Sequence, residues 1–373
     1  MTSKYDLKNA EFNIERQSSI WQFRDFLPPV SPKRIVSLGE GWTSYVNASR
    51  YGESIGLRNL FCKLEGQNPS GSFKDRIASL GLSLAMEWEK KGVFTASSGN
   101  AAAAVSAYAA RAGIPSLILI REDASVAKLS QILMYGAKLL RVRDLFKNQV
   151  SLMKALELTQ QGVPDWLNHF VWAPVNPLLT DALKTIAYEL YSQGVPDLVF
   201  VPTAGGDLVH GIFAGFYELH ALGLIERLPR MVVVQGANAN PTVLAIEKGE
   251  EKVAESTKAE TVAGALRVNF GAEHTLFAVK ESEGFGISVT DEEILNAQNQ
   301  IAKLEGIFTE ASSATALAGI SKAVKLGKVE KDEKVAAILT GIGFKEFFPP
   351  VQDMSQVPLA TSPELIPSIL KSF

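Results

Sequence analysis

Short apolar segments alternate with longer amphipathic segments along the chain from residue 61 onward. The apolar segments have the length and composition of strands, and the amphipathic ones have the spacing of helices. Strands that alternate with helices form a parallel sheet covered on both faces, so the sequence predicts an α/β fold. The expected strands are 61–65, 93–96, 116–120, 138–142, 170–173, 198–202, 230–235, 275–280 and 335–340. The expected helices are 73–91, 99–112, 125–135, 145–161, 180–193, 207–222, 291–305 and 313–326.

The turn that follows the first strand, residues 68–76, carries a lysine at the expected start of a helix. Turns at the carboxyl ends of parallel strands are where α/β folds bind their ligands. An ammonium is disfavoured at Lys74, because the positive end of the helix dipole lies close by. A neutral amine that forms a Schiff base would explain the placement. A solvated lysine at a helix start explains it equally well from this segment alone.

Four polar or small residues lie between the next strand and an alanine-rich helix, namely Ser97, Ser98, Gly99 and Asn100. The N-terminus of a helix offers free N–H groups and a positive dipole end, which suit an anion such as a substrate carboxylate. The two hydroxyls and the amide add further donors. Simple N-capping explains one such residue but not four together, so we favour an anion site here.

Two glycines, Gly205 and Gly206, follow the expected strand at 198–202. They allow the backbone to approach a ligand closely, and the next helix would offer N–H groups to a phosphate. Asp207 opposes this interpretation, because a carboxylate beside a phosphate is repulsive, and we interpret it as the N-cap of the helix. For His210 we expect helix packing rather than contact with a ligand.

The last expected strand ends in Thr340, with glycines at 341 and 343. The Thr340 hydroxyl can bond its own backbone at the turn. Alternatively, it can face a ring nitrogen that stays unprotonated, because a hydroxyl is a far weaker acid than a carboxylate. The residues of this turn leave both interpretations open.

The overall composition excludes several classes of function. The 373 residues carry a formal net charge of −3, so no basic field favours nucleic acid or an anionic membrane surface. No apolar run reaches the ~18 residues of a membrane span, and the N-terminus lacks the apolar core of a signal peptide, so we expect a cytoplasmic protein. The single cysteine, Cys62, excludes an internal disulfide framework and is expected in the core. The histidines lack the spacing of a metal site.

Taken together and in this order, the four turns resemble those of the fold-type II pyridoxal-phosphate enzymes, and most of all their threonine synthase branch. The motifs that carry the resemblance are Asn-Pro-Ser-Gly-Ser-Phe-Lys-Asp-Arg (68–76), Ala-Ser-Ser-Gly-Asn (96–100) and Leu-Thr-Gly-Ile-Gly-Phe-Lys-Glu (339–346). Ser-Ala-Tyr-Ala-Ala-Arg-Ala-Gly-Ile-Pro (106–115) and Glu-Ala-Ser-Ser-Ala-Thr-Ala-Leu-Ala-Gly (310–319) are also similar to that branch. The resemblance covers about residues 36–348.

The resemblance implies the two-lobed, parallel-sheet architecture of tryptophan synthase β-like enzymes. Residues 1–35 would then be an N-terminal arm. Residues 36–92 and 177–373 would form the large cofactor-binding domain, and residues 93–176 the small domain. A homodimer that acts on a small amino-acid substrate is also implied.

The resemblance further assigns roles to individual residues. Lys74 would hold pyridoxal 5′-phosphate through a Schiff base and then move protons, Asn100 would bond the phenolic oxygen, and Thr340 would face the pyridine nitrogen. The backbone of Thr203, Ala204, Gly205, Gly206, Asp207 and Leu208 would hold the cofactor phosphate. The substrate carboxylate would be bound by Ser97, Ser98 and Gly99, and the pocket near the ring would be lined by Glu310 and Ser312. Lys345 and Glu346 are expected at the surface, just outside the site.

The sequence departs from the threonine synthase pattern at three places. Those enzymes usually place an arginine two residues after an Asn-Pro pair, where it binds the substrate phosphate, whereas Leu179 stands there in this chain. Ala101 replaces a threonine that often serves the same phosphate, and the cofactor loop reads Thr-Ala-Gly-Gly-Asp-Leu rather than a glycine-rich run. One charge-assisted hydrogen bond contributes roughly 1.5–3 kcal/mol, so the absence of the arginine would weaken the binding of a substrate phosphate. Lys184 lies nearby in sequence as a possible substitute.

Three functional hypotheses follow. The first is a pyridoxal-phosphate-dependent lyase of the threonine synthase type, which converts O-phosphohomoserine and water to threonine and phosphate. The second is β-elimination or β-replacement on serine, threonine or O-phosphoserine, as in dehydratases or cysteate-type synthases. The third is a non-catalytic protein that binds a cofactor or metabolite, although the joint presence of Lys74, Asn100 and Thr340 opposes it.

Overall fold

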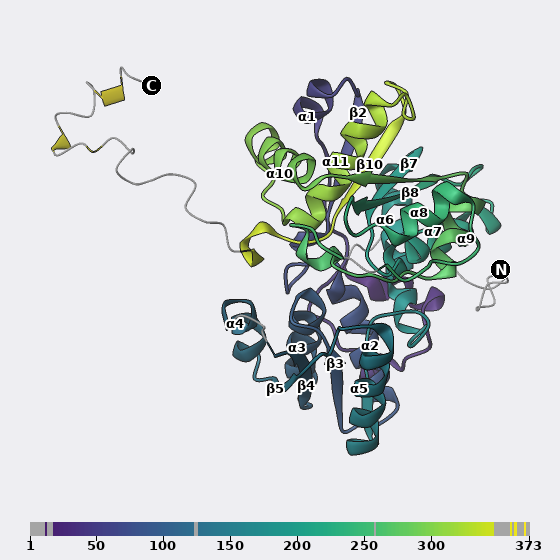
Figure 1. Cartoon of the computed structure of the whole chain (residues 1–373). Coiled ribbons are helices and arrows are strands. Elements are labelled where there is room, and N and C mark those ends of the chain that lie inside the picture. Colours follow the sequence, from purple (N-terminus) through teal and green to yellow (C-terminus); the bar gives the residue numbers. More distant parts are fainter. Residues whose placement is uncertain are drawn as a thin grey trace.

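Two separate sheets organise the chain in the computed structural model, which describes residues 12, 18–122, 126–256, 259–346, 359, 362–363 and 369–370. The six-stranded sheet has the order β1-β2-β10-β7-β8-β9 and consists of β1 (Tyr45–Asn47), β2 (Asn59–Leu64), β7 (Leu198–Pro202), β8 (Arg230–Gly236), β9 (Phe285–Val289) and β10 (Lys334–Leu339). The four-stranded sheet has the order β5-β4-β3-β6 and consists of β3 (Gly92–Ala96), β4 (Ser116–Arg121), β5 (Lys138–Val142) and β6 (Trp166–Asn168). All neighbouring strands pair in parallel except β1 and β2. This is the predicted α/β architecture, and the two sheets lie in two lobes (Figure 1).

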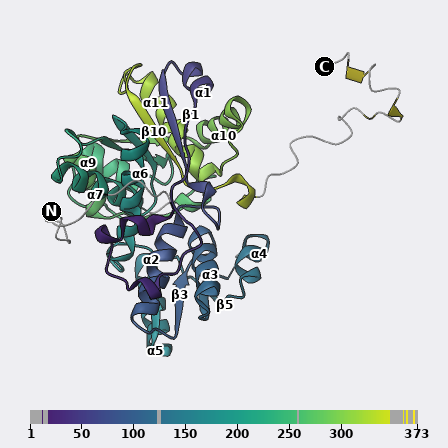
Figure 2. The ribbon, with the colours of Figure 1, turned by 180° about the vertical axis from the view of Figure 1, so that it is seen from behind.

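Helices cover both faces of the large sheet, because its strands carry apolar side chains on both sides. Val199 and Val201 of β7 belong to one buried cluster, whereas Leu198 and Phe200 belong to the other. Figure 2 shows α6, α7 and α9 on one side of this sheet and α1, α10 and α11 on the other. The helices are α1 (Ser49–Ser54), α2 (Lys74–Glu87), α3 (Asn100–Ala112), α4 (Val126–Met134), α5 (Gln149–Gly162), α6 (Lys184–Gly194), α7 (Asp207–Ala221), α8 (Pro241–Lys248), α9 (Glu273–Glu281), α10 (Asp291–Glu305) and α11 (Ala311–Lys325).

Helix α2 packs against the cores of both lobes. Ile77, Leu80 and Leu84 lie in the cluster that includes α6 and α7. Leu82, with the neighbouring alanines of α2, lies in the cluster of the four-stranded sheet, against α3. Successive turns of one helix thus join the two hydrophobic cores, and its first residue, Lys74, lies where the lobes meet.

Two predicted strands are wrong. The segment 275–280 belongs to α9, and the outer strand of the sheet is β9 instead. Thr275, Leu276 and Val279 are buried at helical spacing, which explains why a short apolar run forms a helix here. The segment 170–173 is also not a strand, because β6 precedes it and Trp172 N–H already donates to the Phe170 carbonyl in a turn.

The remaining predicted strands and helices coincide with observed elements to within a few residues, as far as the described residues extend. Cys62 is fully buried in β2, as predicted. In the part of the chain that the structure describes, no helix combines the length and the apolar character needed to cross a membrane.

Candidate active site

A cleft of about 1100 Å³ lies at the carboxyl ends of the parallel strands. Its walls include every residue that the sequence proposed for the site: Lys74, Ser97, Ser98, Gly99, Asn100, Thr203, Ala204, Gly205, Gly206, Asp207, Leu208, Glu310, Ser312 and Thr340. These residues come from five separate stretches of the chain, so their meeting is a consequence of the fold. Their individual roles remain predictions.

Lys74 is the first residue of α2 and is partly exposed to the cleft. Burial lowers the pKa of its amine to about 8, although the carboxylates of Asp207 and Glu310 favour the charged form. The Nζ atom lies 4.4 Å from the centroid of the Phe73 ring. Desolvation therefore keeps a sizeable fraction of this amine neutral near physiological pH, as a nucleophile requires.

The Ser97–Asn100 turn connects β3 to the N-terminus of α3. Gly99 is the N-cap residue of this helix, and its N–H donates to Ser97 Oγ over 3.2 Å. The α3 helix has 13 residues, so it has the free N–H groups and the dipole on which the predicted anion site depends, and the site itself stays a prediction.

Asn100 and Glu310 meet in the middle of the cleft. Asn100 Nδ2 lies 3.1 Å from each carboxylate oxygen of Glu310. Burial raises the pKa of Glu310 to about 7, because desolvation outweighs the hydrogen bond from Asn100. Glu310 is therefore partly protonated near neutral pH and can both donate and accept.

Thr340 directly follows the β10 strand, and its hydroxyl contacts another buried hydroxyl. Ser313 Oγ lies 3.0 Å from Thr340 Oγ1 and also accepts a bond from the Gly341 N–H over 2.9 Å. Ser313 is fully buried and was not predicted from the sequence. Thr340 lines the cleft, and its hydroxyl also donates to Glu310 Oε1 over 3.4 Å. A hydroxyl at this position is available to a ligand in the cleft, as one of the two interpretations requires.

The prediction that Asp207 caps α7 is wrong. Gly206 is the N-cap, with a φ of 100° that favours glycine, and the helix begins at Asp207. The Asp207 carboxylate accepts a bond from the Ala173 N–H over 2.9 Å and lies 3.3 Å from His274 Nε2. The N–H of Thr203 donates to the Val234 carbonyl, and the N–H of His210 donates to the Gly206 carbonyl. The N–H groups that a ligand can use therefore lie between these two residues.

The expectation for Lys345 is also wrong, and the possibility left open for Lys184 is not borne out. Lys345 lines the cleft and donates from Nζ to Asn100 Oδ1 over 2.9 Å, so it is not a surface residue outside the site. Lys184 is buried and lies 3.1 Å from Glu218 Oε1, away from the cleft, so it does not replace the missing arginine.

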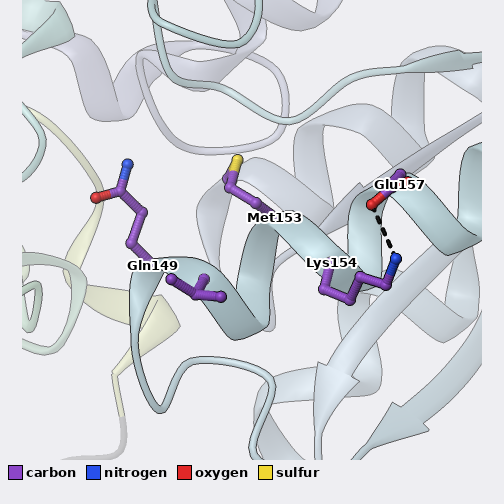
Figure 3. Close-up of a pocket in the computed structure, with 5 residues that line it drawn as sticks. Gln149, Met153, Lys154 and Glu157 are labelled. Atoms are coloured by element: carbon purple, nitrogen blue, oxygen red, sulfur yellow. Dashed lines mark hydrogen bonds and ion pairs between the residues drawn. The ribbon is translucent and has the colours of Figure 1, made fainter.

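A second hollow, of about 470 Å³, lies on the exposed face of α5. Figure 3 shows Gln149, Met153, Lys154 and Glu157 along this helix, with one Lys154–Glu157 ion pair of 3.1 Å. The side chains that line this second hollow do not bring a nucleophile and hydrogen-bond donors together. Within the described ranges there is also no cluster of three or more residues able to hold a metal ion.

A profile of the family described as "Pyridoxal-phosphate dependent enzyme" matches residues 36–341, which is most of the chain. The chain belongs to this family. The match includes each of the strand-to-helix turns around the cleft, so the fold-type II resemblance is confirmed.

Two curated relatives of this chain are both named threonine synthase. The threonine synthase of Methanosarcina acetivorans is 36% identical over 347 residues, which cover 90% of this chain and 84% of that protein. The threonine synthase of Methanocaldococcus jannaschii is 35% identical over 338 residues, which cover 89% of this chain and 82% of that protein.

Solved structures agree on the fold. Maize serine racemase superimposes with a TM-score of 0.70 at 23% identity, over 88% of this chain and 92% of that one. The processed form of threonine deaminase isoform 2 from Solanum lycopersicum has a TM-score of 0.70 at 21% identity, over 89% and 93% of the two chains. Identities this low support the architecture of a fold-type II enzyme and not a particular reaction.

For a pyridoxal-phosphate-dependent enzyme, the cleft must offer unused donors to the cofactor phosphate, and it does. Thr275 Oγ1 and Trp172 Nε1 are buried polar atoms without a hydrogen-bond partner among the described residues. The Thr275 hydroxyl lies against Gly206, and the Trp172 indole nitrogen lies 3.3 Å from where a Cβ on Gly205 would be. Trp172 lines the cleft, whereas the Thr275 hydroxyl lies behind Gly206 and is not part of the cleft wall. The unused indole N–H beside a helix N-terminus fits a phosphate dianion.

Gly206→Ala is expected to weaken pyridoxal phosphate binding by about 10- to 100-fold. The new Cβ would collide with the Thr275 hydroxyl, and a φ of 100° is strained for alanine, at a cost of about 1–3 kcal/mol. Fluorescence titration of the apo protein measures the effect. The matched control is Gly264→Ala, at a cleft residue where a Cβ would have no neighbour within 4 Å. Equal affinities in the two variants would contradict this account of the loop.

The rate at which the apo enzyme captures pyridoxal phosphate is expected to rise with pH, with a midpoint at about 8, because only the neutral Lys74 amine attacks. Stopped-flow absorbance measures this profile. The folded pKa of Lys74 lies below its unfolded value, so the unfolded state binds more protons between about 8 and 10.5. The free energy of unfolding of the apo protein should therefore rise with pH across that window. A flat capture profile would contradict the lowered pKa.

Proposed function

We propose that this pyridoxal-phosphate-dependent lyase is a threonine synthase, which converts O-phosphohomoserine and water to threonine and phosphate. The observation that carries the proposal is the similarity to proteins named threonine synthase over about 90% of the chain. The cleft supports it, because it joins a desolvated lysine to an anion-binding turn and a separate phosphate-binding loop.

Bound pyridoxal phosphate supplies an electron sink for negative charge that develops on the substrate. Lys74 would hold the cofactor, and its neutral amine would remove and return protons at the substrate carbons. The start of α3 binds the substrate carboxylate and fixes the orientation of the α-carbon. Thr340 would offer a neutral hydroxyl to the ring nitrogen, which would leave that nitrogen unprotonated and suit elimination and replacement chemistry. Glu310 accepts a hydrogen bond from Asn100 Nδ2 over 3.1 Å and so keeps a titratable carboxyl group within the cleft.

A second candidate is β-elimination or β-replacement on serine, threonine or O-phosphoserine. One observation favours it: Leu179 stands where threonine synthases usually carry the phosphate-binding arginine, and its side chain is buried in the core rather than in the cleft. The neighbouring Asn176 side chain is committed to the Phe170 carbonyl over 2.7 Å. A substrate phosphate would thus need another cation from the cleft wall, which includes Arg121 and Arg267.

A substrate panel tests the proposal. The holoenzyme is mixed separately with O-phosphohomoserine, serine, threonine and O-phosphoserine, while phosphate release, keto-acid formation and the visible spectrum are followed. Phosphate and threonine from O-phosphohomoserine are the expected products. Keto acid from serine or threonine, with no spectral response to O-phosphohomoserine, would overturn the proposal in favour of the second candidate. A spectrum that responds to none of the four would favour a non-catalytic binding protein.

The proposal extends to the organisation of the protein. We place the N-terminal arm at 1–35, part of which lies outside the described residues, the large domain at 36–92 and 177–373, and the small domain at 93–176. The four-stranded sheet supports this division, because its strands span only residues 92–168. We further expect a cytoplasmic homodimer, which analytical ultracentrifugation of the holoenzyme would test for its oligomeric part.

A further inference from the structure

Lys345 reaches Asn100 across the cleft although the two residues are 245 positions apart. Lys345 ends a short 3-10 helix, Gly343–Lys345, that follows the β10 strand. Its stem passes Gly71, where a Cβ would lie 3.0 Å from Lys345 Cε and where φ is 90°. The glycine in the Lys74 turn therefore leaves the path open along which this side chain enters the cleft.

The contact determines which way the Asn100 amide faces. A lysine ammonium donates and cannot accept, so Oδ1 is the amide atom that faces it over 2.9 Å. Both amide N–H groups are then on the opposite side, where Nδ2 lies 3.1 Å from the two Glu310 oxygens. Glu310 by itself would not fix this orientation near neutral pH, because a protonated carboxyl can also donate.

We propose that Lys345 is a positioning residue of the cofactor site, which acts through Asn100. By holding Oδ1, it presents the amide N–H groups to the phenolic oxygen of bound pyridoxal phosphate. In an amide turned the other way, Oδ1 would face the phenolic oxygen. The hydrogen bond would be lost, and two acceptors would face each other. The inference rests on the proposed function, because the phenolic oxygen faces Asn100 only when the cofactor binds in this cleft.

Lys345→Met tests the role, because methionine keeps the length of the stem and removes the donor. The expected result is about tenfold weaker pyridoxal phosphate binding, the equivalent of one hydrogen bond. The bound cofactor should also lose its longer-wavelength absorbance band, in which the phenolic oxygen is ionised, in favour of the shorter-wavelength band. Lys345→Arg keeps a donor and should restore the spectrum. The matched control is Lys322→Met, at a partly buried lysine that donates to the Ser288 carbonyl outside the cleft.

A double-mutant cycle separates positioning from general structural support. In an Asn100→Ala background, Lys345→Met should change cofactor affinity and the band ratio by less than about twofold, because the amide it orients is gone. Equal effects of Lys345→Met in both backgrounds would overturn the proposal, as would a wild-type spectrum in the single variant. Lys345→Ala gives the same comparison if methionine disturbs the fold, which far-UV circular dichroism monitors. A wild-type protein that develops no visible band with the cofactor would overturn the cofactor site itself, and this role with it.

Discussion

Lys74→Ala is expected to abolish the visible absorbance that the wild-type enzyme develops with pyridoxal phosphate, and to lower kcat by at least about 10³-fold. The amine is the only group proposed here both to hold the cofactor covalently and to move protons at the substrate. Its lowered pKa of about 8 means that little energy is needed to neutralise it before reaction. Absorbance titration and single-substrate turnover measure the two effects.

The matched control for this prediction is Lys91→Ala, at an exposed lysine shortly after the end of α2. It should leave both the spectrum and the turnover unchanged. A Lys74→Ala protein that still develops the covalent band would show that another amine holds the cofactor. Non-covalent cofactor binding in that variant, detected by fluorescence, is expected to persist, because the phosphate loop is intact.

Arg76→Met is expected to lower the free energy of unfolding by about 3–5 kcal/mol, because it leaves the buried Glu65 carboxylate without its cationic partner and leaves Glu189 with Lys63 alone. Arg76 lies two residues after Lys74, is fully buried, and donates to Glu65 in two bonds of 2.7 Å. It also donates to Glu189 over 2.9 Å, and Lys63 donates to the same carboxylate over 2.7 Å. Chemical denaturation followed by circular dichroism measures the loss. The exposed Arg58–Asp332 pair provides the control, since Arg58→Met should cost at most about 1 kcal/mol.

The contacts of Arg76 and Lys63 with Glu189 also predict how the free energy of unfolding depends on pH. Burial by itself would raise the pKa of Glu189, but Arg76 and Lys63 lower it to about 2. The folded pKa lies below the unfolded value of 4.5, so the stabilisation is complete above about pH 4.5 and is lost as the pH falls toward about 2. In Arg76→Met this acid-dependent loss should be smaller. Similar slopes in wild type and variant would contradict the assignment.

The strand-to-helix turns could be predicted because their signals are local. Lys74, Asn100 and Asp207 each begin a helix that the apolar spacing of the sequence already indicated. The same local rules failed at 275–280, where a run of five apolar or β-branched residues looked like a strand and forms α9. They also missed β9, because Gly286 is a weak strand residue whose lack of a side chain accommodates Val243 of α8.

Long-range contacts of polar residues could not be predicted. The 339–346 motif includes Lys345 but gives no sign that its side chain enters the cleft, because its partner Asn100 comes from the other lobe. Lys63, Arg76 and Glu189 likewise look like solvated charges and are fully buried. The roles of Ser313 and Thr275 follow only from the structure, in which they contact Gly341 and Gly206. A single sequence gives the spacing of charges along the chain but not which charges the fold brings together.

The packing of α2 has a consequence for motion between the lobes. On the side of α6 and α7 it offers Ile77, Leu80 and Leu84, large side chains that interlock with their neighbours. Toward α3, whose buried face is built largely of alanines, it offers mainly alanines and Leu82. Small side chains present a smooth surface, so a shear displacement of a few tenths of an ångström to about 2 Å requires little repacking there. The turn proposed to bind the substrate carboxylate can therefore move with the small sheet, while Lys74 stays anchored to the large one.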